Sequence, residues 1–105
     1  MFERHQKNIE TVMTDSSVSK FLRDARDFVR NKQYDQALRE MRLIRKLFGD
    51  FPTLTAYEKG CKALKDGKYE QAKDIFLEAF QKEQNPTIAR YIRATAISAY
   101  IRMIE

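Results

Sequence analysis

Cysteine, histidine and tryptophan are nearly absent from this chain of 105 residues, which has one cysteine, one histidine and no tryptophan. Because Cys61 is alone, no intrachain disulfide can form, which excludes a disulfide-stapled scaffold and favours a reducing, cytoplasmic location. His5 and Cys61 provide neither a cluster of metal ligands nor a nucleophile and base with a third orienting group. We therefore expect no metal, no cofactor and no catalytic residue, and predict that the protein is not an enzyme.

Glycine and proline are also scarce, with three and two residues respectively. The chain is 43% hydrophobic and 33% charged, a composition that argues against disorder and against a collagen-like repeat. No long uncharged apolar run is present, so we expect no membrane span. Residues 1–10 lack the apolar centre of a signal peptide. The sequence thus predicts a soluble, globular domain.

The excess of positive charge is modest and evenly spread. Twenty Lys and Arg residues against fifteen Asp and Glu give a net charge of +5. Arg39, Arg42 and Lys46 fall on one helical stripe that could contact phosphates, but Asp35 and Glu40 dilute it. The charge pattern is typical of a solvated helical surface that could favour an acidic partner, and RNA or DNA binding is only a weak alternative.

The spacing of apolar residues is helical throughout the chain, at intervals of three, four and seven positions. Pro52 and Pro86 interrupt this pattern, and each can occupy the first turn of a new helix. We predict an all-α domain of about six helices joined by short loops. The expected parts are an N-terminal helix (1–15), a first helical hairpin (17–51), a second hairpin (53–85) and a C-terminal helix (87–105).

Two segments of the chain repeat one another. The run KQYDQAL at residues 32–38 matches GKYEQAK at residues 67–73, with Ala37 and Ala72 at equivalent places 35 positions apart. Each run joins the two helices of one hairpin. A helix–turn–helix period near 34 residues is the sequence signature of tetratricopeptide repeats. Residues 20–86 therefore resemble two such repeats, followed by a capping helix.

The second unit resembles the family more closely than the first. The family packs its paired helices through small residues, and Gly60 and Ala72 would allow a close approach that Phe76 fills. The first unit is degenerate, with Met41 and Ile44 at later signature positions. The family's small and aromatic positions are matched in the second unit by Gly60, Gly67, Tyr69, Ala72, Phe76 and Ala79, and in the first by Phe21, Ala25, Phe28 and Ala37.

The resemblance implies a concave groove lined by the first helix of each unit. Tetratricopeptide domains that clamp the carboxylate tails of heat-shock chaperones use Lys and Asn where this chain has Leu22, Tyr57 and Cys61, which disfavours that function. A mostly apolar groove with a basic margin suits a hydrophobic or amphipathic segment of another protein. The N-terminal helix, residues 2–14, could instead fold back and fill it. The expected groove residues are Leu22, Arg26, Val29, Arg30, Tyr57, Cys61, Leu64, Lys65 and Tyr91.

The C-terminal helix carries a second signal, because its apolar side chains occur nearly all round the helix. A helix with one solvent face normally shows a polar stripe opposite its core. Either a partner or a second copy of the chain could cover Tyr100, Ile101, Met103 and Ile104, or the helix could simply curl into the core.

We therefore expect a non-enzymatic adaptor or small chaperone that binds a hydrophobic or amphipathic helical segment of a partner protein in its groove. The alternative is a homo-oligomeric assembly protein, such as a homodimer, that pairs through its C-terminal helix. Two further resemblances are to small chaperones of type III secretion needle subunits and to the cytosolic domain of the mitochondrial fission receptor. The second rests on local similarity around Gly60-Cys61 and Tyr69.

Overall fold

The computed structural model describes residues 15–105, and every regular element in that range is an α-helix. The all-α prediction is confirmed. About six helices were expected and five are described. The first fourteen residues of the expected N-terminal helix, 1–15, lie outside the described range. The five helices are α2 (Asp15–Arg30), α3 (Tyr34–Phe48), α4 (Pro52–Lys65), α5 (Tyr69–Lys82) and α6 (Pro86–Ile104).

The helix boundaries follow from local sequence. Pro52 and Pro86 are the first residues of α4 and α6, where a missing N–H costs nothing. Asn85 caps α6, because its Oδ1 accepts hydrogen bonds from the backbone N–H groups of Thr87 at 2.9 Å and Ile88 at 3.2 Å. These short-range signals explain why the sequence places the breaks correctly.

The turn between α2 and α3 and the turn between α4 and α5 both pass through the left-handed backbone region. Gly67 adopts φ 78° between α4 and α5, and Lys32, its equivalent in the first repeat, adopts φ 62° between α2 and α3. Glycine enters this region freely, whereas a side chain makes it unfavourable. The turn at Lys32 therefore adopts the same left-handed conformation as the turn at Gly67, although a residue with a side chain is less stable in that conformation.

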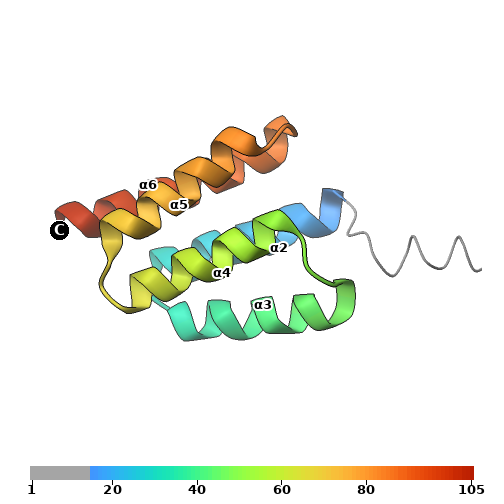
Figure 1. Ribbon diagram of the computed structural model, residues 1–105, viewed down its shortest axis with the longest axis horizontal. Coiled ribbons are helices and arrows are strands. Elements are labelled where there is room, and N and C mark those ends of the chain that lie inside the picture. Colours follow the sequence, from blue (N-terminus) through green and yellow to red (C-terminus); the bar gives the residue numbers. More distant parts are fainter. Residues whose placement is uncertain (1–14) are drawn as a thin grey trace, which may run out of the picture.

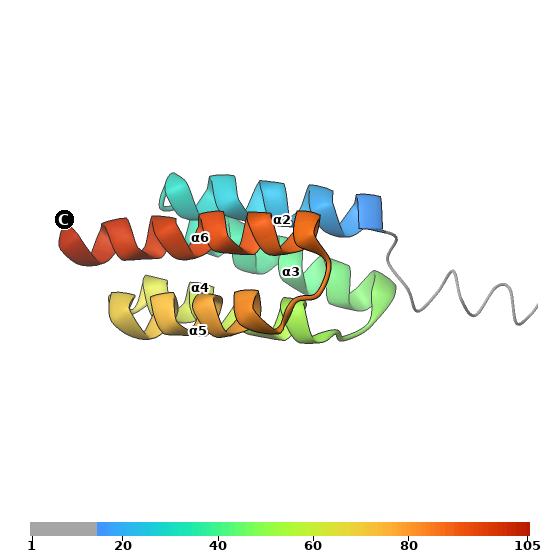
Figure 2. The same ribbon diagram turned by 90° about the horizontal axis from the view of Figure 1, so that it is seen from above.

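The five helices form a closed ring in which each packs against the next and α6 returns to pack against α2 (Figure 1). Figure 2 shows α6 lying alongside α2, with α4 and α5 on the other side of the molecule. The α3 helix packs mainly against α2 and α4 and lies on the opposite side of the ring from α5 and α6.

The core runs through the middle of this ring. Tyr57 lies at its centre, with its ring centroid 5.7 Å from that of Phe21 and 5.0 Å from that of Phe76. Gly60 is the point of close approach between α4 and α5, because a Cβ added there would lie 2.4 Å from Cζ of Phe76. The close packing expected at Gly60 is therefore observed. None of the helices described here is long and apolar enough to cross a membrane.

Candidate functional site

The space that sequence analysis predicts as an open groove is occupied by α6. Five of the expected groove residues are almost completely inaccessible to solvent, with exposed fractions of 0% or 1%. The reason is that α6 folds back onto α2 instead of extending the row of helices. The expectation of an open groove is thus wrong for the described part of the chain, and the filling helix is α6. The five buried residues are Leu22, Val29, Tyr57, Cys61 and Leu64.

A pair of linked hydrogen bonds joins α6 to Tyr57 of α4. The Tyr57 hydroxyl donates to Oγ1 of Thr95 at 2.9 Å, and the Thr95 hydroxyl donates to the backbone carbonyl of Tyr91 at 3.2 Å. Both Tyr57 and Thr95 are fully buried. Burial raises the pKa of Tyr57, so its hydroxyl stays protonated and available as a donor. These two hydrogen bonds satisfy the hydroxyls of Tyr57 and Thr95, which would otherwise be costly to bury.

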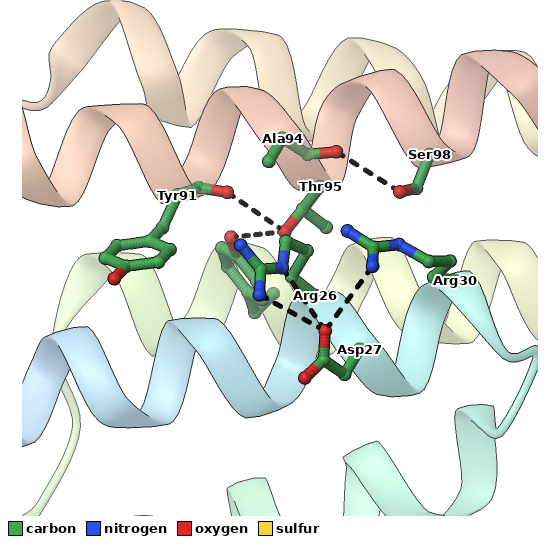
Figure 3. Close-up of polar contacts among 8 residues, drawn as sticks. Arg26, Asp27, Arg30, Tyr91, Ala94, Thr95 and Ser98 are labelled. Atoms are coloured by element: carbon green, nitrogen blue, oxygen red, sulfur yellow. Dashed lines mark hydrogen bonds and ion pairs between the residues drawn. The ribbon is translucent and has the colours of Figure 1, made fainter.

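The edge of the α2–α6 contact is polar (Figure 3). The guanidinium of Arg26 lies over the ring of Tyr91, 5.7 Å from its centroid, and also contacts Oδ1 of Asp27 at 3.3 Å. Arg30 is exposed and reaches the same oxygen of Asp27 at 3.9 Å, a long contact for an ion pair. Arg26 therefore links Tyr91 of α6 to Asp27 of α2, and Arg30 reaches the same carboxylate from the next turn of α2.

Lys65 lies away from this edge. Its ammonium group pairs with Oδ1 of Asp35 on α3 at 2.7 Å, which connects α4 to α3 and not to α6. Lys65 lowers the pKa of the Asp35 carboxyl through this hydrogen bond and its charge. The structure thus separates Lys65 from the other basic residues expected at the groove margin.

The C-terminal end of α6 is held by both repeat-related tyrosines. The Arg102 guanidinium donates to the hydroxyl of Tyr34 at 3.1 Å and to that of Tyr69 at 2.8 Å. It also lies 4.7 Å from the centroid of the Tyr69 ring and pairs with Glu105 at 2.6 Å. Tyr34 and Tyr69 begin α3 and α5, so one side chain of α6 ties together the starts of two helices.

The outward face of α6 carries a row of large apolar side chains that are about half exposed. Ile97, Tyr100, Ile101 and Ile104 are 48%, 46%, 46% and 61% exposed. Their spacing of three, four and seven places them on one side of the helix. We call these four residues the α6 stripe.

The α6 stripe overlaps the C-terminal surface expected from sequence but is not identical to it. Tyr100, Ile101 and Ile104 are exposed as expected, whereas Met103 is only partly exposed. Ile97 was missed. Its position three residues before Tyr100 and four before Ile101 is the signal that could have identified it.

The same face of α6 becomes basic toward its N-terminus. Arg93 and Arg90 are exposed one and two turns before Ile97, respectively, and neither has an ion pair among the described residues. No acidic residue occurs in α6. The outward face is therefore apolar over its C-terminal half and positively charged over its N-terminal half.

The described residues contain no arrangement suited to metal binding, and the one thiol is inaccessible. No group of three His, Cys, Asp or Glu side chains is close enough to hold an ion within residues 15–105. Cys61 is fully buried, and burial raises the pKa of its thiol to about 12. His5 lies outside the described residues. The surface features of α6 are thus the strongest candidate site.

No protein-family model, curated protein or solved structure matches this chain.

Proposed function

We propose that the protein is an interaction module that binds an amphipathic helix of a partner protein on the outward face of α6. The observation that carries the proposal is the α6 stripe, in which four large apolar side chains are about half exposed on one helix face. Contiguous apolar patches of this kind are uncommon on monomers and are typical of binding surfaces. Helix-on-helix recognition uses the same spacing of three, four and seven.

Charge specifies the kind of partner. Arg90 and Arg93 extend the α6 stripe toward the start of the helix, and Arg30 lies on the α2 side with only a long contact to Asp27. A partner helix whose apolar face is followed by one or two acidic turns would match this distribution. Complementary charges of this type orient a partner and increase its rate of association.

The resemblance to tetratricopeptide repeats provides the structural frame of the proposal. We infer that α2–α3 and α4–α5 are two such units and that α6 is a capping helix folded over their inner surface. Three features support this reading: the approach of Phe76 to Gly60, the matching turns at Lys32 and Gly67, and the paired tyrosines that hold Arg102.

A second candidate function is self-association through the same stripe. An antiparallel pairing of two α6 helices centred between Tyr100 and Ile101 would place Ile97 opposite Ile104 of the other copy. The spacing of the four residues is symmetric about that centre, as an isologous contact requires. Arg90 and Arg93 favour an acidic partner over self-association, because a second copy of α6 offers no carboxylate that could pair with them.

The test is a titration with a labelled helical peptide that carries leucines at spacings of three, four and seven followed by two glutamates. We expect fluorescence anisotropy to show saturable binding that Ile101→Asp weakens at least tenfold. Gln81→Asp, an equal change of charge on exposed α5 surface, is the control and should bind like the native protein. Equal binding by both variants would overturn the proposal, and a dimer mass by light scattering would favour self-association.

A further inference from the structure

The outward face of α3 is a second surface, distinct from the α6 stripe. Leu43 and Leu47 are 55% and 61% exposed and lie one turn apart. Arg39, Arg42 and Lys46 are exposed beside them, on an arc of the helix that faces away from the core residues of α3. The three basic residues span about 10 Å along the helix axis. We call these five residues the α3 face.

Two carboxylates of α3 border the α3 face, and neither pairs with its basic residues. Asp35 is paired with Lys65 at 2.7 Å, and Glu40 is half-buried and interacts with Asp24 and Lys20 of α2. Glu58 and Asp50 are both held by Arg45, with Glu58 bound through both of its oxygens at 2.8 and 2.9 Å. Arg39, Arg42 and Lys46 therefore carry charge that no ion pair within residues 15–105 offsets.

The opposite side of the molecule lacks unpaired positive charge of this kind. Glu70, Asp74 and Glu78 are exposed along α5, where Lys73 pairs with Asp74 at 3.2 Å and Lys82 pairs with Glu78 at 3.3 Å. Figure 1 shows α3 and α5 on opposite sides of the ring. The basic residues of the α3 face therefore have no counterpart along α5, and this asymmetry favours an anionic ligand on the α3 side.

We propose that the α3 face docks on a lipid bilayer that carries anionic lipids. Leu43 and Leu47 would enter the boundary between headgroups and acyl chains, while Arg39, Arg42 and Lys46 would contact lipid phosphates. Amphipathic helices that lie on membranes combine apolar and basic residues in this way, and each Lys or Arg near the surface contributes about 1 kcal/mol.

The composition of the α3 face favours a bilayer over a partner helix. The α6 stripe has four large apolar side chains in one row, whereas the α3 face has two leucines with three basic residues beside them along the same stretch of helix. Leucines beside basic residues match an acyl boundary beneath a layer of lipid phosphates. Docking through α3 would leave the α6 stripe free, since α6 packs against α2 and α5.

The experiment is co-sedimentation of the full chain with vesicles of phosphatidylcholine alone and with vesicles that also contain phosphatidylserine, whose negative surface potential attracts basic residues. The charge variant is Arg42→Glu with Lys46→Glu, and the apolar variant is Leu43→Ser with Leu47→Ser. The matched control is Lys59→Glu with Lys68→Glu, which changes the net charge equally at exposed positions outside the α3 face. Circular dichroism confirms that each variant is folded.

We expect binding to the anionic vesicles only. The charge variant should reduce the partition coefficient at least tenfold, the apolar variant at least threefold, and the control less than twofold. Equal losses in the charge variant and the control would show attraction by net charge alone and overturn the proposal. Unchanged binding of the apolar variant would overturn leucine insertion. If the native chain binds no vesicles, the membrane proposal is overturned, and an acidic protein segment becomes the ligand expected for the α3 face.

Discussion

The hydroxyl of Tyr57 donates a hydrogen bond to Oγ1 of Thr95 across 2.9 Å of fully buried core. These residues are 38 positions apart, and their bond joins the centre of α4 to α6. It is a fully buried polar contact of α6, which packs against α2 and α5, and it acts together with the hydrogen bonds of Arg102 near the end of the helix. The position of this helix in turn determines which of its sides is exposed.

Loss of this bond should destabilise the protein measurably. Thr95→Val keeps the shape of the side chain but leaves the buried Tyr57 hydroxyl without its acceptor, at a cost of about 1–3 kcal/mol. Adding Tyr57→Phe removes the orphaned hydroxyl, so the double variant should be more stable than Thr95→Val alone. Urea denaturation of the four proteins measures this, and purely additive losses would contradict the assignment.

The left-handed turn at Lys32 should be improved by glycine. Lys32→Gly removes the side chain from a backbone with φ 62°, and we expect a gain of about 1 kcal/mol. Gly67→Ala should have the opposite effect at the equivalent turn, where an added Cβ would meet nothing within 4 Å. Because the added Cβ at Gly67 meets no other atom, any loss of stability in Gly67→Ala would come from backbone strain alone. Thermal denaturation of both variants checks the signs, and destabilisation by Lys32→Gly would contradict this account.

The stability should depend on pH through Glu40. Burial, and then the charge of Asp24, raise the pKa of the Glu40 carboxyl above its usual 4.5, and its Oε1 has no hydrogen-bond partner in the described structure. A carboxyl with a raised folded pKa favours folding when protonated, and this contribution is lost as the pH rises through that pKa. Glu40→Gln should therefore raise the melting temperature at pH 7 and change it little below pH 4.

Thermal melts at both pH values test this prediction, with Glu70→Gln on exposed α5 surface as the control. An equal change at pH 4 and pH 7 for Glu40→Gln would show that its charge is not responsible.

Cys61 should react slowly with thiol reagents while the protein is folded. Its thiol is buried in the space that α6 fills, and its pKa is raised to about 12, so little thiolate is present at neutral pH. We expect labelling by a disulfide reagent at pH 8 to be at least a hundredfold slower than in 6 M urea. Thr95→Val, which loosens α6, should speed the reaction. Rapid labelling of the native chain would instead indicate an open groove.

The sequence was sufficient for features that depend on neighbouring residues. Pro52 and Pro86 determine helix starts, and the repeat around Ala37 and Ala72 places the turns before α3 and α5. These are local effects of backbone geometry and hydrogen bonding, so the pattern of residues reveals them directly.

The path of α6 could not be predicted in the same way. It depends on contacts between distant residues, such as Arg102 with Tyr34, which are 68 positions apart. The all-round apolar pattern of α6 did indicate that both of its sides needed cover, but spacing alone does not say which side faces the core. For this reason five of the nine expected groove residues are buried, while part of the expected C-terminal surface is exposed.

The most direct test of the central claim is a nuclear magnetic resonance map of the acidic amphipathic peptide on the isotope-labelled protein. We predict that shifts will concentrate at Ile97, Tyr100, Ile101 and Ile104, with smaller changes at Arg90 and Arg93. The buried residues Leu22, Tyr57 and Cys61 should be unaffected, because α6 stays in place. Large shifts at these buried residues would contradict the account, since they would show that the peptide displaces α6 and enters the space beneath it.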